Sequence, residues 1–420
     1  MNRICRNSTL VACFAALMPV VTLITMSSHA LAGGLARPNG WGPQNTSVGG
    51  AGSTMVDDPT ALLINPAALA FASPQVMLGA EYVFAPRTYT PVNAAGTRGA
   101  DQSASAQAPL PLFGAIGRFS YNGRPSRFTI GIAALNTFGG KLSYPATNVP
   151  AINATQDAVV EFLIGTSFEI SDRLAIGASL RVGLGLFSTD VTDLPITAKV
   201  ESNGLGVGMT LGGMFRPTDR IKLAAVWRSP LTVRTSGNSV IQFPSGPSSQ
   251  LAEHTQRWPQ QAVLGASVDV TRAWTLALQA DWSEWSRVQV LAVELPKMPA
   301  LSQRYPVAWN DSYAARIGTE YRLNPRVRIR GGAWFDSNAV PDRTIERIYL
   351  DNNKVGISGG VGLRLGMWAV DFAADVGLPN KRTIADNRAS TIGWPDMQNR
   401  APGEHSGSIY SGELAFRRMF

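Results

Sequence analysis

The chain is poor in the side chains from which most catalytic and metal sites are built. Of its 420 residues, two are cysteines, Cys5 and Cys13, and three are histidines. Both cysteines lie in the N-terminal leader discussed below, so the remaining chain has no thiol for a disulfide, a zinc site or a nucleophile. His254 and His405, in expected loops, show no metal-binding spacing and no serine–acid partners for a hydrolase. We therefore expect no enzyme activity, no metal and no cofactor.

Long apolar runs and charged residues are also scarce. Beyond residue 32 no stretch of about 18 apolar residues occurs, so we expect no transmembrane helix there. Charged residues make up 16% of the chain, against about 25% in soluble domains, whereas glycine occurs 41 times. The net charge of +8 includes two leader arginines and is otherwise dispersed, so nucleic-acid binding has no support. The Gly-rich string 204–208 lies within a strand pattern, which argues against a nucleotide site.

Residues 1–32 are typical of a secretory signal peptide. Two arginines precede an apolar core at 10–26, and Ala-Leu-Ala at 30–32 forms an A-x-A cleavage site. The alternative is an uncleaved anchor helix, which Pro19 and the short core disfavour. We expect an exported protein whose mature chain begins at residue 33.

From residue 74 onward, apolar and small polar residues alternate with the period of β-strands. Within 128–135, for example, Phe128, Ile130 and Ile132 share one face, and Thr129 and Gly131 share the other. A soluble sandwich would alternate in the same way, but its polar face would carry many Lys and Glu residues. Here that face is small and Gly-rich, which favours strands that expose their apolar face to lipid.

About 14 such strands are expected, joined by connections that alternate in length. The short connections lie near 122–126, 171–173, 217–220, 271–273, 324–326 and 366, and the long ones over 87–108, 137–156, 236–253, 292–308, 337–353 and 379–406. Short inner turns that alternate with long external loops are typical of outer-membrane barrels. The sequence therefore predicts an all-β fold, a 14-stranded antiparallel transmembrane β-barrel over residues 74–420.

The lipid-facing parity also predicts which charged residues face inward. Arg or Lys on the lipid face at mid-depth costs about 2–4 kcal/mol, so charges on the strands belong in the lumen. The inward set is Arg181, Arg228, Asp281, Arg316, Glu320, Arg328, Arg330, Asp371, Asp375 and Arg417. We expect most of them to pair with one another or to hold the N-terminal segment, and a minority to meet a substrate carboxylate.

Residues 33–73 form a separate segment, rich in Gly, Pro, Asn and Ser, without a clean period. Short helical turns are expected within 57–70, with Asp57 or Asp58 as N-cap and Pro59 at the first helical position. Fourteen strands fall between the filled barrel of eight and the open porin of sixteen, so the lumen is wide enough to need a plug. We predict that 33–73 is a hatch domain inside the barrel.

Several short blocks resemble one known family. Its N-terminal pattern is matched by the Gly-rich run 49–52, the pair Asp57-Asp58 and then Asn65-Pro66-Ala67, directly after the signal peptide. Further similar blocks lie at 227–230, 281–286, 309–321 and 331–342. Together they resemble the outer-membrane long-chain fatty acid transporters, a family that includes aromatic-hydrocarbon uptake porins. The terminal Phe420 also resembles the signal read by the barrel-insertion machinery, which we expect as a partner.

The resemblance implies passive uptake of a hydrophobic molecule. External loops would capture the ligand, the hatch would move, and the ligand would leave sideways through a break in the third strand. The runner-up function is a polar-solute porin; an outer-membrane enzyme or adhesin is a third class. We expect a monomer in the outer membrane of a Gram-negative cell, in contact with lipid and lipopolysaccharide.

The same resemblance implies particular site residues. Leu35 matches the mature N-terminal residue that enters the family's binding pocket, and Asp336 matches an acidic residue near it; Arg181 and Arg316 are our candidates for a substrate carboxylate. The lateral break corresponds to Asn136, Thr137, Phe138, Gly139 and Gly140, where adjacent glycines permit a kink. The alternatives are plug packing for Leu35, capping of backbone N–H groups for Asp336, and an ordinary loop start for 136–140. Trp282, Trp285, Trp309 and Trp368 are alternatively residues of the interfacial belt.

Overall fold

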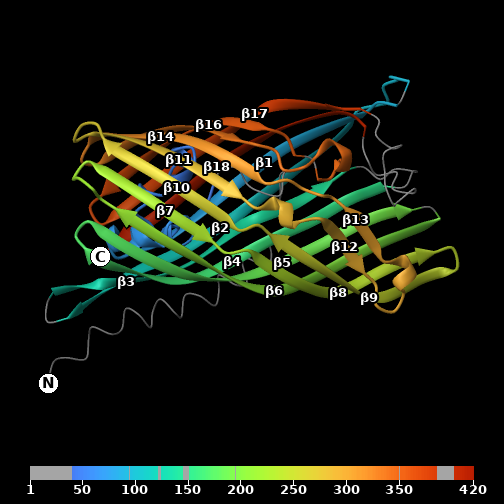
Figure 1. Ribbon diagram of the computed structural model, residues 1–420, viewed down its shortest axis with the longest axis horizontal. Coiled ribbons are helices and arrows are strands. Elements are labelled where there is room, and N and C mark those ends of the chain that lie inside the picture. The colour runs from blue at the N-terminus through green and yellow to red at the C-terminus, as the bar shows by residue number, and fades with distance from the viewer. Residues whose placement is uncertain are drawn as a thin grey trace.

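The computed structural model describes residues 40–93, 95–121, 124–144, 151–193, 195–349, 351–385 and 402–420. Tilted strands form a closed wall around a lumen, and the last strand, β18 (Gly403–Met419), pairs antiparallel with the first, β1 (Gln75–Pro91) (Figure 1). A closed sheet leaves no strand edge at the seam, which a wall in lipid requires. Among the described residues, no helix is long and apolar enough to span a membrane.

Eighteen strand segments make up the 14 strands of the barrel, because four strands are each divided in two. The divided strands are β7 (Ile221–Arg228) with β8 (Leu231–Phe243), β9 (Gly246–Trp258) with β10 (Gln261–Asp269), β11 (Trp274–Ser283) with β12 (Val290–Glu294), and β13 (Gln303–Pro306) with β14 (Ser312–Asn324). The undivided ones are β1, β2 (Gln102–Tyr121), β3 (Arg124–Ser143), β4 (Ala151–Ser171), β5 (Leu174–Asp193), β6 (Ile196–Phe215), β15 (Val327–Asp336), β16 (Lys354–Leu365), β17 (Trp368–Ile384) and β18. The predicted fold class is confirmed.

The outer surface of the wall is an apolar band between two aromatic rows. Large apolar side chains face outward along the strands, for example Leu205 and Leu264, which are 67% and 66% exposed. One row contains Trp227 and Tyr313, and the other contains Trp274 and Trp368. Such rows mark the two membrane interfaces of a barrel, so the band between them is the lipid-facing belt.

The predicted direction of the charged side chains is confirmed. Every residue of the predicted inward set is buried or half-buried, and at least one of its two neighbours along the strand is exposed. Arg418, which parity places on the lipid face, lies at the end of β18 and stacks over the rings of Trp368 and Phe420, each 5.4 Å away. Its position at the interface lets a long cationic side chain reach water.

At the end of the barrel away from the C-terminus, strands replace most of the expected long loops. The expected loop 236–253 is a hairpin of β8 and β9, and strand covers most of the described part of 137–156 and both ends of 87–108 and of 379–406. Among the described residues, 337–349 and 351–353 keep the character of a loop, with one 3₁₀ turn, η4 (Asp342–Thr344), and the middle of 292–308 is irregular as well. Beyond the lipid the outward face turns polar, so the alternation that revealed the strands fades although their pairing continues. His254 and His405 accordingly lie in β9 and β18 and are buried, not in loops as expected.

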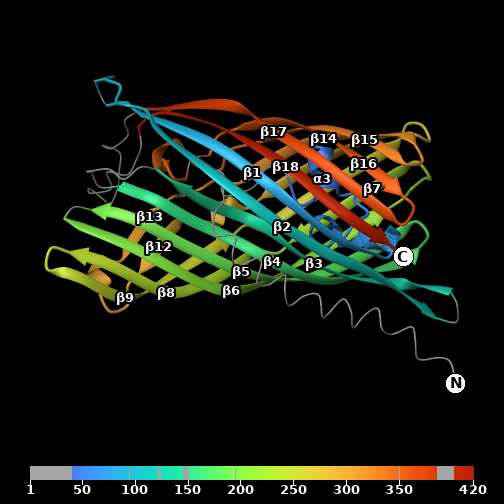
Figure 2. The same ribbon diagram turned by 180° about the vertical axis from the view of Figure 1, so that it is seen from behind.

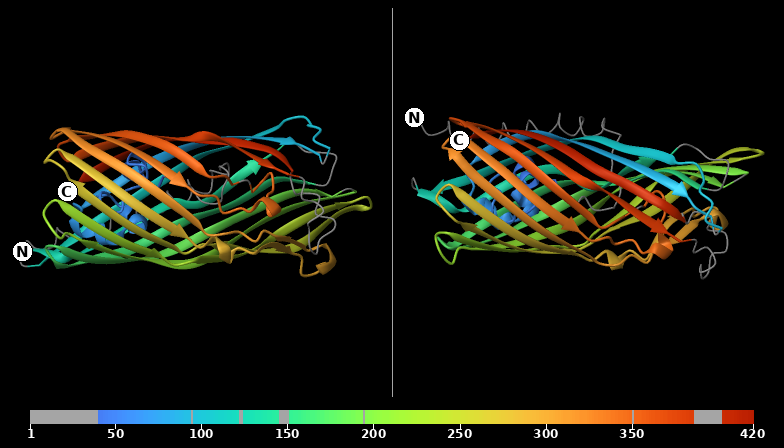
Figure 3. Two further views of the ribbon diagram at one scale, coloured as in Figure 1. Left: turned by 45° about the horizontal axis from the view of Figure 1, so that its top comes forward. Right: turned by 90° about the horizontal axis from the view of Figure 1, so that it is seen from above.

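Residues 40–73 lie inside the lumen, at the end where β18 finishes (Figure 3). They form α3 (Pro43–Ser47), α4 (Ala61–Ile64) and the 3₁₀ helix η1 (Pro66–Phe71). The N-cap of α4 is Thr60 rather than Asp57 or Asp58, and Pro59 precedes the cap; Asp58 instead accepts hydrogen bonds from the N–H and hydroxyl of Thr60. Asn65 caps η1 by accepting from the N–H of Ala67, with Pro66 at the first position.

Candidate substrate-binding lumen

Alternating charges fix the N-terminal segment to one side of the barrel. The Asp57 carboxylate lies 2.8 Å from Nη1 of Arg417 on β18. Arg417 also pairs with Asp371 at 2.7 Å, and Asp371 with Arg330 at 2.8 Å. Arg330 pairs in turn with Glu320 at 2.9 Å. These inward charges therefore pair with one another and with Asp57 of the N-terminal segment.

A second anchor, on the opposite wall, is Arg228 of β7. Its guanidinium donates to the carbonyl oxygens of Leu63 and Ile64, at 2.8 and 3.3 Å, and so satisfies the C-terminal carbonyls of α4. It also lies 5.1 Å from the ring centroid of Trp41. Arg228 thus binds the N-terminal segment to the barrel wall.

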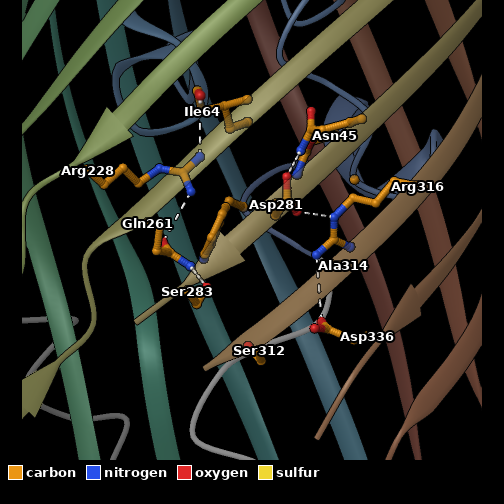
Figure 4. Close-up of a pocket in the computed structure, with 13 residues that line it drawn as sticks. Asn45, Ile64, Arg228, Gln261, Asp281, Ser283, Ser312, Ala314, Arg316 and Asp336 are labelled. Atoms are coloured by element: carbon orange, nitrogen blue, oxygen red, sulfur yellow. Dashed lines mark hydrogen bonds and ion pairs between the residues drawn. The ribbon is translucent and has the colours of Figure 1, made fainter. Parts of the chain in front are cut away.

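A polar cavity lies between this segment and the wall (Figure 4). Arg316 of β14 sits in it between two carboxylates, 2.5 Å from Asp281 of β11 and 3.7 Å from Asp336 of β15. Asn45 and Ile64 line the segment's side of the cavity. A guanidinium shared between two carboxylates already has its charge compensated, so a substrate carboxylate would have to displace Asp281 or Asp336 to bind it.

Arg181 of β5 is fully engaged in a different place. Its Nε and Nη2 bind the Glu161 carboxylate at 2.5 and 2.7 Å, and its Nη1 donates to the carbonyl oxygen of Ser229 at 3.2 Å. Glu161 also accepts from the hydroxyl of Thr137 at 2.6 Å. The side chains of Arg181 and Glu161 are 1% and 0% exposed, so this is a buried ion pair that links β4 and β5.

Above the N-terminal segment the lumen is lined by a row of aromatic rings. Phe138 stacks on Trp258 with ring centroids 5.0 Å apart, and Trp258 meets the edge of Trp285 at 6.2 Å. Trp285 meets Trp309 at 5.5 Å, and Trp309 lies 6.3 Å from Tyr349. Apolar side chains from several strands surround the row, so the rings belong to one hydrophobic cluster inside the barrel.

The row begins at an irregular part of β3. The register with β4 shifts between Asn136 and Phe138, which is a β-bulge, and Gly139 has φ of +78°. A Cβ on Gly139 would lie 1.7 Å from the carbonyl oxygen of Asp157, so only glycine fits there. Trp41 of the N-terminal segment donates to the carbonyl oxygen of Thr137 at 3.3 Å.

The wall is incomplete next to this bulge. β2 pairs with β1 up to Gln102, but its pairing with β3 ends at Phe113 and Ala134 (Figure 2). In the described strands, 102–112 of β2 and 135–143 of β3 therefore share no ladder. Yet the side chains of Leu135–Phe138 are buried, so β3 bends into the lumen here.

Comparison with known proteins identifies the family. A family model described as outer membrane protein transport protein (OMPP1/FadL/TodX) matches residues 23–410. The chain belongs to this family. It is therefore a member of a family of outer-membrane transport proteins, and not of an enzyme family.

Solved structures share the fold. A FadL homologue of Pseudomonas aeruginosa has a TM-score of 0.77 at 17% identity, over 93% of this chain and 100% of that one. The toluene transporter TodX of Pseudomonas putida has a TM-score of 0.71 at 16% identity, over 91% and 99%. The alkane uptake protein A of Marinobacter nauticus is 23% identical over 230 residues, which cover 51% of this chain. The matched part of the chain covers 50% of the length of this curated relative.

The predicted site residues occupy different places. Arg316 and Asp336 lie together in the polar cavity, Arg181 lies apart in its buried pair, and Leu35 lies outside the described residues. The segment Asn136–Gly140 holds the bulge rather than a loop start. Of the tryptophans treated as alternative belt residues, Trp368 is exposed on the belt, but Trp285 and Trp309 are both 3% exposed and line the lumen.

The sequence analysis did not predict the aromatic row. It also missed a pair of prolines that marks the unpaired edge of β2. Pro109 and Pro111 lie two apart on β2, so both remove a backbone N–H from the same edge of that strand. Proline is tolerated in a sheet where that edge needs no partner. The pair therefore indicates which strand lacks a neighbour.

Proposed function

We propose that the protein is a channel for passive uptake of hydrophobic molecules, long-chain fatty acids or aromatic hydrocarbons, across the outer membrane. The observation that carries the proposal is the aromatic row, which ends with Phe138 at the bulge of β3 beside the unpaired edge of β2. An apolar ligand can exchange one ring surface for the next along such a row without entering water. The names of its relatives extend the substrate class to toluene and alkanes.

In the proposed mechanism, 33–73 is a hatch and the gap beside β3 is the exit. The hydrogen bond from Trp41 to the Thr137 carbonyl couples the two, because a shift of the hatch changes the support of the bulge. A ligand that reaches Phe138 would then pass between β2 and β3 into the outer leaflet. This route avoids the polar cavity and the charge network, both unfavourable for an apolar ligand.

Leu35 and the polar cavity have secondary roles in this proposal. We keep Leu35 as the apolar group that the N-terminus offers to a ligand tail. Arg316 and Asp336 would set the polarity of the cavity floor rather than clamp a carboxylate, since Arg316 is compensated by Asp281.

Uptake by a deletion strain tests the function. Cells without the protein should take up radiolabelled oleate or toluene more slowly than cells with it, and complementation should restore the rate. If the deletion strain and the complemented strain took up each of the two substrates at the same rate, the proposal would be contradicted. Planar-bilayer recordings separate the alternative, because a polar-solute porin would show a steady open conductance and a hatched channel would not.

A further inference from the structure

The wall has a second interruption, between β9 and β12, which lie near the end of the barrel away from the C-terminus (Figure 1). The ladder between β10 and β11 ends at Gln261 and Ser283, and pairing resumes only at His254 with Val293. In this described part of the wall, the stretches between those two pairs share no ladder, and the chain turns through the 3₁₀ helix η2 (Trp285–Arg287) instead. The two divided strands therefore separate for several residues.

This break lies at the level of the lipid headgroups. Trp227, in the aromatic row farther from the C-terminus, donates its indole N–H to the side chain of Gln260 at 3.1 Å. Arg257 lies three residues farther along the same divided strand, about 10 Å along the chain. Because barrel strands are tilted by about 40°, that distance is roughly 8 Å of height, close to the thickness of one headgroup layer. The predicted topology places this end outside the cell, so the layer belongs to the outer leaflet.

A groove of about 420 Å³ lies over the break. Its volume is within the range of roughly 300–1,000 Å³ that is typical of ligand sites. It opens on the outer face of the wall, because Arg257 is exposed whereas its neighbours Gln256 and Trp258 are buried. We call it the outer groove; its charged and amide side chains are Glu253, Arg257, Arg287, Gln289, Glu294 and Arg304.

Two arginines of the outer groove have donors that the protein does not use. Arg257 forms no ion pair with any described residue. Arg287 lies 3.5 Å from Glu284, longer than an ordinary hydrogen bond, and its buried Nε has no acceptor among the residues that the structure describes. Each of the two is four residues from the last ladder pair, Gln261 with Ser283, so both lie at the end of the groove nearer the hydrocarbon core.

The acidic side chains of the groove lie at its other end. Glu253 is opposite Glu294 in the register of β9 and β12, and Glu294 pairs with Arg304 at 3.1 Å. Glu253 is four residues from Arg257, which is about 13 Å along an extended strand. The carboxylates therefore leave the positive charge at Arg257 and Arg287 available to an anion.

Below the groove, the same two divided strands continue into the apolar belt. Leu264 of β10 and Leu278 of β11 are large side chains exposed on the outer face. A ligand that fits both surfaces has an anionic group at the headgroup level and acyl chains beneath it. The outer leaflet of a Gram-negative outer membrane consists of lipopolysaccharide, whose lipid A carries phosphate groups and several acyl chains.

We propose that the outer groove binds a phosphate group of lipopolysaccharide, with Arg257 and Arg287 as its ligands. The planar guanidinium group matches two phosphate oxygens at once, which gives both affinity and orientation. A lipid seated there covers the break in the wall, and its acyl chains lie against Leu264 and Leu278. The ligand is a component of the membrane and not the transported molecule, so this site is independent of the proposed uptake function.

Binding of lipid A to the purified barrel tests the two arginines. Native mass spectrometry of the protein in detergent, titrated with diphosphorylated lipid A, measures the lipid-bound fraction. Arg257→Gln should weaken binding about tenfold, the size of one charge-assisted hydrogen bond, and Arg287→Gln should act in the same direction. Arg257→Lys keeps the charge without the bidentate geometry and should lose less. The matched control is Lys297→Gln, which removes an exposed cation near the same end but outside the groove and should leave binding unchanged.

Changes in the lipid test the role of the phosphate. Lipid A without its phosphates should bind at least tenfold more weakly than the intact lipid, and Arg257→Gln should not weaken it further. Equal binding of the two lipids, or an equal loss in Arg257→Gln and Lys297→Gln, would overturn the proposal. If phosphatidylglycerol binds as tightly as lipid A and loses binding in Arg257→Gln, the groove is a general site for anionic lipids and the assignment to lipopolysaccharide is wrong.

Protection of an introduced thiol tests the location. Gln289 is exposed and lines the groove, so the maleimide reaction of Gln289→Cys should slow at least fivefold when lipid A is bound. Ser249→Cys, in the hairpin of β8 and β9, should react at the same rate with and without the lipid. An unprotected Gln289→Cys, in protein with normal heat-modifiable mobility and bound lipid A, would place the lipid elsewhere and overturn the proposal. The uptake test is separate, because failure to transport oleate or toluene would not change any of these lipid A measurements.

Discussion

The carboxylate of Asp57 lies 2.8 Å from Nη1 of Arg417, a residue 360 positions later in the chain. The contact joins the lumenal segment to the last strand, and Arg417 continues through Asp371 into the wall. Arg417 lies on β18, the strand that closes the barrel against β1. The same arginine therefore contacts both the closing strand's neighbours and the lumenal segment. A loosened segment therefore need not mean a loosened barrel, and the two can be separated by mutation.

Asp57→Asn should release the segment more often without affecting the barrel. The Asp57 side chain is 41% exposed, so the ion pair is partly screened and is worth about 1 kcal/mol at most. That energy corresponds to about a fivefold rise in the open fraction, measured as transient conductance in planar bilayers. The control is Glu404→Gln, which breaks the external ion pairs with Arg98 and Lys381 and should not change conductance. Unchanged recordings for Asp57→Asn would show that Arg417 does not retain the segment.

The buried pair of Arg181 and Glu161 predicts a non-additive pair of mutations. Arg181→Met alone leaves the Glu161 carboxylate buried without its cation and should lower the free energy of unfolding by about 3–5 kcal/mol. The double variant with Glu161→Gln removes both charges and should recover most of the loss. Urea unfolding from lipid vesicles, followed by tryptophan fluorescence, measures both. If Arg181 instead binds a substrate carboxylate, both variants would lose fatty-acid binding equally while stability changed little.

Labelling of intact cells tests the orientation of the barrel. A cysteine in place of Ser249, in the hairpin of β8 and β9, should react with an impermeant maleimide, and one in place of Asn324, the last residue of β14, should not. Cysteines in place of Asn148 and Asn387, which lie outside the described residues, are also predicted to be labelled, because β3 and β17 end on the same side of the barrel as that hairpin. Once the predicted signal peptide is removed, the engineered thiol is the only one in each variant, since both natural cysteines precede residue 33. If only the cysteine in place of Asn324 were labelled, the barrel would have the opposite orientation in the membrane.

The sequence predicts the wall of this barrel better than its interior, for a physical reason. A charge on the lipid face is costly, so parity alone places Arg181, Arg316 and Asp371 inside, and the structure agrees. Extending that parity from Asp281 through Ser283 would also have placed Trp285 inside.

Other interior features depend on breaks in the period. Trp309 lies in the irregular stretch 307–311 between β13 and β14, where parity carries no information. The break in the wall between the pairs Gln261–Ser283 and His254–Val293 likewise depends on missing pairing, which is a property of two strands and not of either sequence. The polar strand ends beyond the lipid resemble loops for the same reason, since alternation marks a strand only where one face is apolar.

Gly139→Ala tests whether the bulge of β3 is needed for uptake. The added Cβ would meet the carbonyl oxygen of Asp157 at 1.7 Å, and the φ of +78° is itself unfavourable for alanine by about 1–2 kcal/mol. The strand must therefore shift, and the shift carries Phe138 away from Trp258 and lets β3 approach β2. We expect a barrel that still assembles, judged by heat-modifiable mobility, but takes up toluene and oleate at least tenfold more slowly.

Gly412→Ala is the matched control for this change. It also adds a methyl group to a barrel glycine, but no atom lies within 4 Å of the added Cβ. Uptake and mobility should therefore match the unaltered protein. Phe138→Ala provides an independent reading, because it removes the ring and keeps the backbone of the bulge. A normal uptake rate in both Gly139→Ala and Phe138→Ala would exclude the bulge and its ring from the path of the substrate, whereas loss in Phe138→Ala alone would retain the ring and exclude the backbone geometry.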